Sequence, residues 1–286
     1  MRELHGKVAV VTGGASGIGR ALAEAFCRER MHVVIGDVEE PALQQAVNCL
    51  AKQGASITGV AADVSRAADV EGLRDHALSA FGAVHVVCNN AGIATAGTVD
   101  GTPPERWRWT LDVNLWGVIH GCRTFLPLLL EQRQGHIVNT ASIAALAGHA
   151  NLGAYTASKY AVAGLSECLH HELAAAGSPV RVSLFCPGLV QTSIRNSERN
   201  RPAHVPPASP WPGTTQAGPT AAAANPPELP AAQAAAAVLQ GIRDERFWIF
   251  THPEMTRQEI EARTAWMLDD ANTATQTNHA DAEKPH

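Results

Sequence analysis

The sequence contains little of what marks a membrane-spanning, secreted or nucleic-acid-binding protein. Its longest apolar stretches, such as FLPLLL at 125–130, are far shorter than the roughly 20 residues that a spanning helix needs. Glycines interrupt the N-terminal MRELHGKVAVVTGG too soon for the apolar region of a signal peptide. Basic runs are absent and the net charge is −5, so neither nucleic acid nor an anionic membrane is an expected partner.

Paired cysteines and metal-ligand spacings are also missing. The six cysteines are scattered over 286 residues, and no two of them form a CxxC pair. The thirteen histidines show no HExxH or similar spacing. Reduced thiols in a cytoplasm fit this usage better than a disulfide framework or a zinc site. We therefore expect a cytoplasmic protein without a metal.

What the sequence does contain is a regular alternation of short apolar runs and helical patterns. Strand-like runs lie at 7–11, 32–37, 57–63, 84–92, 135–142 and 180–188. Each run is continuously apolar, which is typical of a parallel sheet covered on both faces. The predicted fold class is α/β, with a three-layer, doubly wound parallel sheet. Sheets of this kind bind ligands at the carboxyl ends of their strands.

The alternation breaks after residue 200. Residues 202–236 are dense in proline and alanine, which predicts a loop, and the C-terminal stretch is polar. We predict one domain of 286 residues, with its core at 5–200 and 232–252, a substrate flap at 189–232, and a C-terminal helix and disordered tail at 253–286. A surface insertion without a role is the alternative for the flap.

A glycine-rich loop joins the first strand to the first helix. In TGGASGIGR at 12–20, Gly13, Gly17 and Gly19 permit a tight turn and let a pyrophosphate approach the backbone at a helix N-terminus. The next strand ends in Asp37, whose carboxylate would accept hydrogen bonds from the adenosine ribose and repel a 2′-phosphate. No lysine or arginine follows it directly. These features predict NAD rather than NADP as the cofactor; a plain helix N-cap is the alternative for Asp37.

Several motifs in a fixed order resemble the short-chain dehydrogenase/reductase family. They are TGGASGIG at 12–19, Asp63-Val64, NNAG at 89–92, Asn114, Ser142, Tyr155-x-x-x-Lys159 and Pro187-Gly188. The resemblance covers about residues 5–200 and implies a Rossmann fold and an NAD-dependent oxidoreductase acting on CH–OH groups.

Tyr155 and Lys159 lie four residues apart, so a helix places them on one face. An ammonium beside a phenol is expected to lower the pKa of the phenol and make it a better acid or base near neutral pH. The family resemblance implies further roles. Lys159 would also hold the nicotinamide ribose, Ser142 would stabilise charge on the substrate oxygen, and Asn114 would hold a water that links Lys159 to solvent. An amide in a packed core is the alternative for Asn114.

The resemblance also assigns the cofactor site. Asp63 and Val64 would contact the adenine ring, the NNAG turn would close the middle of the site, and Thr192 would contact the carboxamide. Asn89 is expected to support the central strand. The predicted cofactor-binding residues are Gly13, Ser16, Gly17, Ile18, Gly19, Asp37, Val38, Asp63, Val64, Asn90, Ala91, Gly92, Tyr155, Lys159, Pro187, Gly188, Val190 and Thr192.

The substrate side is less clearly marked. Ile143, His149, Leu152, Leu189 and Trp211 are the candidate lining residues. Their mainly apolar character predicts a hydrophobic or aromatic secondary alcohol, interconverted with its ketone, rather than a sugar. A steroid-type hydroxyl dehydrogenase and a catalytically silent nucleotide-sensing protein on the same fold are the alternatives. A dehydratase or epimerase of the extended relatives is disfavoured, because those usually carry a different glycine spacing.

Two helical segments are candidates for self-association. In the family, helices corresponding to 105–122 and to the one through 165–173 pair between subunits, and tetramers are common. Trp107, Trp109, Leu165 and Leu169 supply apolar material here, with an intramolecular core as the alternative. We predict a dimer or tetramer.

Overall fold

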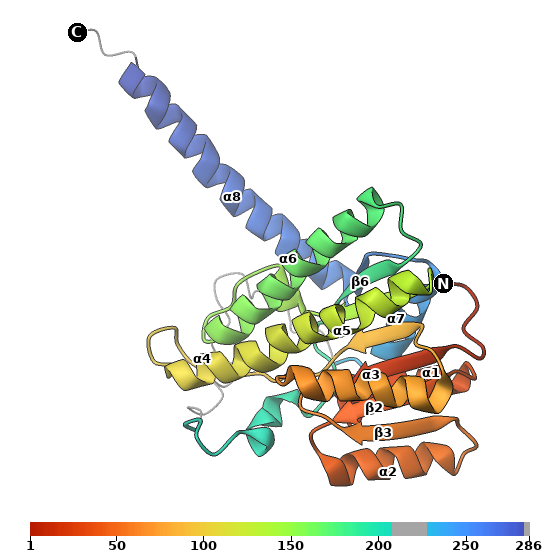
Figure 1. Cartoon of the computed structure of the whole chain (residues 1–286). Helices are drawn as coiled ribbons and strands as arrows, with labels where there is room; N and C mark the ends of the chain where they lie inside the picture. Colours follow the sequence, from red (N-terminus) through yellow and green to blue (C-terminus); the bar gives the residue numbers. More distant parts are fainter. Residues whose placement is uncertain (208–227, 283–286) are drawn as a thin grey trace.

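The computed structural model describes residues 1–207 and 228–282, with side chains as far as Asp270. A parallel sheet of seven strands runs through the molecule in the order β3-β2-β1-β4-β5-β6-β7 (Figure 1). The strands are β1 (Val8–Thr12), β2 (His32–Asp37), β3 (Ile57–Ala61), β4 (Val86–Asn89), β5 (His136–Thr140), β6 (Arg181–Cys186) and β7 (Trp248–Phe250). Six of the seven were predicted. The short β7 was missed, because three residues carry too little pattern to identify a strand.

The register of the sheet places two loops beside each other. In β1 and β4, Val10 is paired with Val87 and Val11 with Cys88, so both strands end at the same edge. The strand order reverses between them, since β1 leads outward to β2 whereas β4 leads toward β5. Ligands of doubly wound sheets bind at such a switch point, outside the carboxyl ends of the strands.

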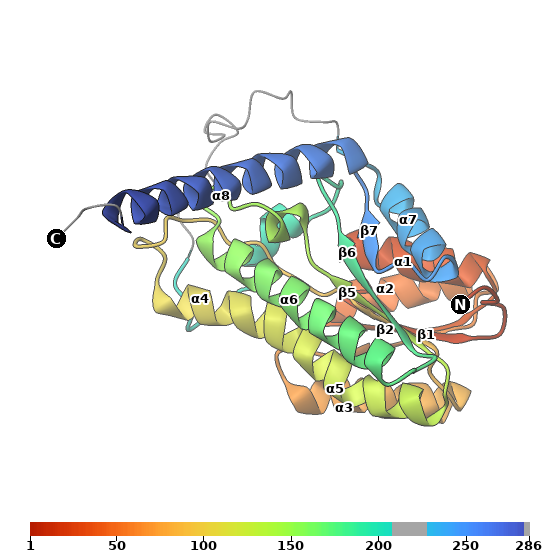
Figure 2. The same cartoon turned by 90° about the horizontal axis from the view of Figure 1, so that it is seen from above.

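Helices cover both faces of the sheet, as the apolar strands require. One core contains apolar side chains of α1 (Gly17–Arg28), α2 (Glu40–Ala51) and α7 (Ala231–Arg243). The other contains side chains of α3 (Ala67–Phe81), α5 (Gly117–Glu131) and α6 (Gly153–Ala175). The predicted three-layer, doubly wound architecture is therefore confirmed, and Figure 2 shows α6 and α5 on one side of the strands and α1 and α7 on the other.

The helix that runs from Pro104 to Glu131 consists of three parts. These are α4 (Pro104–Leu111), a π-helical turn η1 (Asp112–Trp116) and α5. By length and composition alone it is apolar enough to cross a membrane, with a mean hydropathy of 1.2 over 18 residues. Its buried side chains include Asn114, Phe125 and Leu129, and α5 packs on the sheet beside α3. These are the contacts of a core helix.

The chain after β6 departs from the predicted boundaries. A 3₁₀ segment η3 (Ile194–Asn200) follows β6, and α7 begins at Ala231, inside the stretch predicted as loop. Alanine is the strongest helix former, and Pro230 immediately precedes the helix, so AAQAAAAVLQ folds as a helix despite the prolines before it. The rest of the predicted flap, 208–227, lies outside the described residues.

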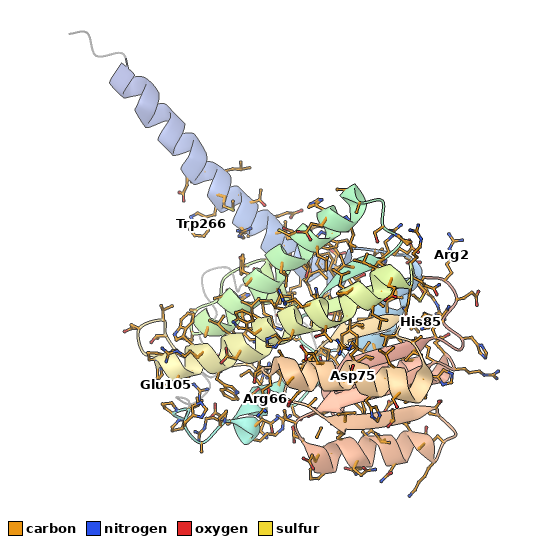
Figure 3. The ribbon with its side chains drawn as sticks, viewed as in Figure 1. Arg2, Arg66, Asp75, His85, Glu105 and Trp266 are labelled. Carbon is orange, nitrogen blue, oxygen red and sulfur yellow. The ribbon has the colours of Figure 1, made fainter. Side chains whose placement is uncertain are left out.

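The C-terminal helix α8 (Pro253–Ala282) projects away from the body of the molecule (Figure 1). The segment 253–286 was predicted as a helix followed by a disordered tail, and the helix continues as far as Ala282. The stretch from Ala271 to Ala282 contains neither proline nor glycine, so nothing in it interrupts a helix. Trp266, labelled in Figure 3, lies on this helix and is 69% exposed.

Candidate active site

A cavity of about 890 Å³ lies along the carboxyl edge of the sheet. Its wall is built by the loops after β1, β2, β3, β4 and β5, together with α4, α6 and the segment that follows β6. Arg66 and Glu105, both labelled in Figure 3, mark its rim at α3 and α4. An elongated cavity at the switch point of a parallel sheet is where a dinucleotide is expected.

The glycine loop is shaped for a ligand that approaches its backbone. Gly17 has a φ of +52°, which favours glycine, and a Cβ on Gly19 would overlap the carbonyl oxygen of Gly13. Ser16 stands at the N-cap of α1 without a side-chain capping bond, so the first-turn N–H groups have no side-chain acceptor. Gly13, Ser16, Gly17, Ile18 and Gly19 all line the cavity. This cradle fits a diphosphate, which binds at helix N-termini.

Thr12 joins the glycine loop to the NNAG turn. Its Oγ1 accepts hydrogen bonds from the backbone N–H groups of Asn90 (2.9 Å) and Ala91 (3.0 Å), and its carbonyl oxygen accepts one from Asn90 Nδ2 (3.0 Å). Asn89 instead points into the core, where its Nδ2 donates to Asn139 Oδ1 at 2.8 Å. The sequence interpretation gave Thr12 no role, because its importance depends on a partner almost 80 residues away.

Asp37 lies at the end of β2 and is 8% exposed. Its two carboxylate oxygens accept backbone hydrogen bonds from Ala15 (3.0 Å) and Glu39 (3.0 Å), which tie the glycine loop to the start of α2. Each oxygen retains acceptor capacity, so Asp37 remains suited to ribose hydroxyls. Arg199 also reaches this part of the cavity, and the sequence interpretation placed no arginine there.

The loop after β3 forms the next part of the wall. Asp63 Oδ1 accepts hydrogen bonds from Ser65 N (2.9 Å) and Ser65 Oγ (2.7 Å). The carbonyl oxygen of Val64 lies 2.9 Å from His120 Nδ1 on α5. His120, which the sequence interpretation did not single out, thereby fixes the backbone that would face an adenine.

Tyr155 and Lys159 lie on the first two turns of α6, as the spacing predicted. Lys159 is 3% exposed, and its Nζ lies 5.7 Å from the centre of the Tyr155 ring. The same Nζ donates a hydrogen bond to the carbonyl oxygen of Thr140 at 2.9 Å. Ser142 begins a 3₁₀ turn two residues after β5, and its Oγ accepts a hydrogen bond from Ala144 N (3.1 Å). Tyr155, Lys159, Thr140 and Ala141 line the cavity.

The pKa of Tyr155 differs from the expected direction. Burial raises it above its ordinary value, and the Ser142 hydroxyl beside it lowers it in part. Lys159 does not reverse the effect; its ammonium lies 5.7 Å from the centre of the ring and donates to the carbonyl oxygen of Thr140. The pKa of Lys159 itself is lowered by burial to about 8. Tyr155 is therefore a neutral phenol here, the form that can donate a proton.

Asn114 lies at the π-helical turn, fully buried. Its Oδ1 accepts a hydrogen bond from Ile93 N (2.8 Å), and its Nδ2 donates to Ile93 O (2.9 Å) and Ser158 Oγ (3.0 Å). Ser158 Oγ in turn donates to the carbonyl oxygen of Tyr155 (2.6 Å). Asn114 thus connects the segment after NNAG to α6, the helix that carries Tyr155 and Lys159. Its predicted water-holding role stays a prediction.

The cavity brings together most of the predicted cofactor residues. All of them line it except Gly188, which packs against His252 and Met255, and Val190, which forms a β-bridge with Leu229. Their binding roles stay predictions. Among the described residues there is no cluster of side chains that could hold a metal ion.

The predicted substrate residues are placed differently. Ile143, His149, Leu152 and Leu189 do not line the cavity, and Trp211 lies outside the described residues. The wall toward α4 instead contains Trp109, Val113, Glu105, Arg108 and His204. It is mixed in polarity rather than mainly apolar. The sequence could not indicate this, because α4 and the segment after β6 meet there from opposite halves of the chain.

Some of the residues predicted to form a subunit interface are instead buried inside this chain. Trp109 and Leu169 are buried in the protein's own cores, and Leu165 packs against the second core. Trp116, on the same continuous helix as Trp109, is 48% exposed. Self-association stays a prediction, and Trp109 and Leu169 are unavailable to it.

Comparisons with known proteins agree with this geometry. A family model described as short chain dehydrogenase matches residues 7–203. A 1-deoxy-11-beta-hydroxypentalenate dehydrogenase of Streptomyces avermitilis is 36% identical over 92% of each chain, and a CLA biosynthesis dehydrogenase/reductase of Lactiplantibacillus plantarum is 32% identical over 89% of this chain and 91% of the relative.

A solved structure has a similar fold over most of the chain. It is a short chain dehydrogenase/reductase from Burkholderia phymatum in complex with NAD, with a TM-score of 0.85 and 40% identity over 94% of this chain and 97% of the other. The matched family model spans the glycine loop, the NNAG turn and the Tyr155–Lys159 helix. The chain belongs to the short-chain dehydrogenase/reductase family.

Proposed function

We propose that the protein is an NAD-dependent oxidoreductase that interconverts a secondary alcohol and its ketone, with Tyr155 as the acid or base. The observation that carries the proposal is the placement of Tyr155, Lys159 and the glycine cradle in one cavity. The NAD complex of the Burkholderia relative and the buried carboxylate of Asp37 support NAD as the cofactor.

In this proposal, different residues bind the cofactor, bind the substrate and transfer the proton. Asp37, the first turn of α1 and the NNAG turn would hold the two halves of the dinucleotide. Bound NAD supplies the hydride acceptor or donor. Ser142 would hold the substrate oxygen, and Tyr155 would give it a proton during reduction or take one during oxidation.

Lys159 has a positioning and a relay role in this proposal. Its pKa of about 8 lets it exchange protons near neutral pH, and its bond to Thr140 keeps the ammonium against the Tyr155 ring. The raised pKa of Tyr155 favours the neutral phenol, which is the form that can donate a proton to a ketone.

The chain offers a matched pair of variants, because Tyr155 and Tyr160 are its two tyrosines and lie on the same helix. Tyr155→Phe should lower turnover by about 10²–10⁴-fold, the usual contribution of a general acid or base. Tyr160→Phe, beside Arg263, should leave turnover within a few-fold of the unmodified protein. NADH binding, followed by its fluorescence, should persist in both.

The assay would use a panel of hydrophobic secondary alcohols and ketones with NAD and NADH. Full activity of Tyr155→Phe would remove Tyr155 from the mechanism. NADH binding without turnover of any panel member would favour the alternative, a catalytically silent nucleotide-sensing protein.

A further inference from the structure

The segment from Ser193 to Pro207, here called the strap, forms one side of the cavity. It leaves the sheet after β6 and contains η3. Five of its residues that line the cavity are Ser193, Ser197, Arg199, Asn200 and Arg201. The strap is attached at α4 and at the start of α2, and only the first attachment includes a fully buried side chain.

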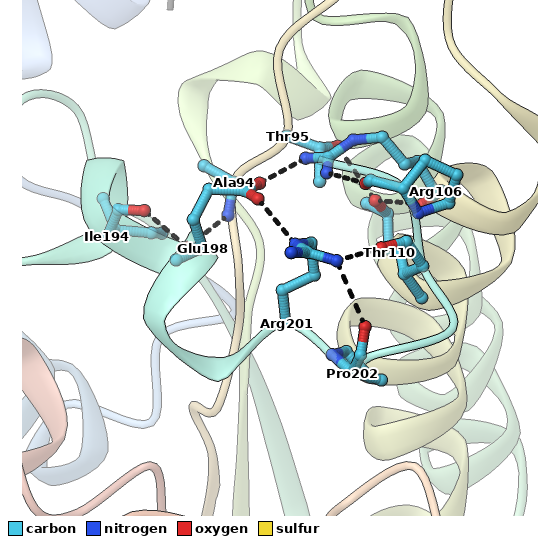
Figure 4. A network of polar contacts seen from close by, with 11 residues as sticks. Ala94, Thr95, Arg106, Thr110, Ile194, Glu198, Arg201 and Pro202 are labelled. Atoms are coloured by element: carbon cyan, nitrogen blue, oxygen red, sulfur yellow. Dashed lines mark hydrogen bonds and ion pairs between the residues drawn. The ribbon is translucent and has the colours of Figure 1, made fainter. Parts of the chain in front are cut away.

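The attachment to α4 is centred on one buried arginine. The Arg106 guanidinium, whose side chain is 1% exposed, pairs with Glu198 at 2.6 Å and donates to the carbonyl oxygen of Pro206 at 2.9 Å. Ala94 N donates to Ser197 Oγ at 3.0 Å. Figure 4 shows this network, in which Arg201 also meets Glu198, at 3.1 Å. Glu198 is 39% exposed, but the Arg106 guanidinium is buried, and a buried charge is costly to leave without its partners, so this end of the strap is firmly held.

The attachment to α2 depends on one carboxylate. Glu39 Oε1 accepts hydrogen bonds from Arg199 Nε (2.9 Å) and Asn200 Nδ2 (2.9 Å), which lie 160 and 161 residues further along the chain. Arg199 is oriented for this contact by its own bonds to the carbonyl oxygens of Ser193 (3.0 Å) and Asn196 (2.8 Å). The side chains of Glu39 and Arg199 are each 29% exposed. Water and salt can reach this pair, so it is the weaker attachment.

The position of Glu39 connects this contact to the ligand. Its backbone N–H donates to Asp37, and both residues line the cavity together with Val38. The contact therefore joins the two walls of the cavity at the end that holds the ribose-binding carboxylate. A dinucleotide lying between these walls would have the strap closed across it.

We propose that Glu39 is a positioning residue that latches the strap over the bound dinucleotide and thereby slows its release. This inference rests on the proposed function only in requiring that the cavity bind NAD or NADH. The buried attachment to Arg106 acts as the fixed end, and the Glu39 contact is the end that opens.

The test compares Glu39→Gln with Glu40→Gln. Glu40 is the next residue, is exposed and does not line the cavity, so its variant removes the same charge without touching the strap. Stopped-flow displacement of NADH should show release about threefold to tenfold faster in Glu39→Gln, the effect expected for losing a half-exposed, charge-assisted contact. Release from Glu40→Gln should match the unmodified protein. Salt at 0.5 M should speed release from the unmodified protein more than from Glu39→Gln.

A second measurement uses the protein without cofactor. Hydrogen exchange of the amides at 193–201 should be faster in Glu39→Gln and unchanged in Glu40→Gln. In a double-mutant cycle, adding Arg199→Met to Glu39→Gln should have less effect than Arg199→Met alone, because the two side chains act through one contact.

Equal NADH release and equal exchange in Glu39→Gln and the unmodified protein would overturn the latch. Additive effects in the cycle would do the same. Failure of the unmodified protein to bind NADH would instead refute the proposed cofactor, while the exchange experiment would still report on the strap contact.

Discussion

Replacing Lys159 by methionine should change how the stability of the protein depends on pH. Lys159 is 3% exposed, and burial lowers the pKa of its ammonium from 10.5 to about 8. The protonated lysine therefore costs the folded state on the order of 3 kcal/mol relative to the unfolded chain. Methionine is of similar length and carries no charge, so the variant lacks this cost.

The sign follows from proton binding. Between pH 8 and 10.5 the unfolded chain holds the lysine proton and the folded protein has released it, so the free energy of unfolding rises with pH. The penalty is fully present below pH 8 and is relieved as pH rises. Between pH 7.5 and 9.5 the unmodified protein should gain about 2 kcal/mol relative to Lys159→Met.

Urea denaturation under reducing conditions, at several values between pH 7.5 and 9.5, measures this difference. The comparison cancels the titration of groups that both proteins share, including the six thiols. Lys52→Met is a matched control, since Lys52 is exposed at the end of α2 and should show no relative change. A difference between the unmodified protein and Lys159→Met that stays constant across this range would refute the buried-ammonium account.

Two other predictions concern the fold and the glycine cradle. His136→Gln should make the stability of the protein less sensitive to acid. Burial lowers the His136 pKa from 6.5 to about 3, so below pH 6.5 only the unfolded chain takes up this proton. In urea titrations between pH 6.5 and 5, the free energy of unfolding of the unmodified protein should therefore fall by on the order of 1 kcal/mol per pH unit more than that of the variant. The same fall in the free energy of unfolding in both proteins over this pH range would contradict this. Gly19→Ala should weaken NADH binding at least about tenfold in a fluorescence titration, because its Cβ would overlap the Gly13 carbonyl oxygen. In the control Gly72→Ala the new Cβ would meet no other atom, and the variant should stabilise α3 by about 0.5–1 kcal/mol. Unchanged NADH affinity of Gly19→Ala would remove the cradle from the binding site.

The local patterns that the sequence carries were sufficient for the fold class and for most of the cavity wall. Continuous apolar runs identified six strands, and parallel strands bring their following loops to one edge. The glycine loop follows β1, Asp37 is the last residue of β2 and NNAG begins at the last residue of β4, so their meeting point was predictable. Tyr155 and Lys159 were predictable as a pair because helical spacing alone places them on one face.

The errors occurred where a property depends on contacts between distant parts of the chain. The pKa of Tyr155 was expected to fall beside Lys159, whereas burial raises it and Thr140 holds the ammonium over the ring. The residues after Ser142 were expected to line the substrate side, and that role stays a prediction, but Trp109 of α4 and Val113 of η1 line the cavity and were not expected there.

The sequence by itself determined which chemical groups stand at the ends of the strands, since a strand, a turn and a helix are specified by neighbouring residues. Only the tertiary structure decided the environment of those groups. Examples are the burial of Lys159, the hydrogen bonds between Thr12 and the NNAG turn, and the contact of Glu39 with Arg199. Burial and charge pairing depend on atoms brought together by folding, and residues separated by 160 positions leave no periodic pattern that joins them.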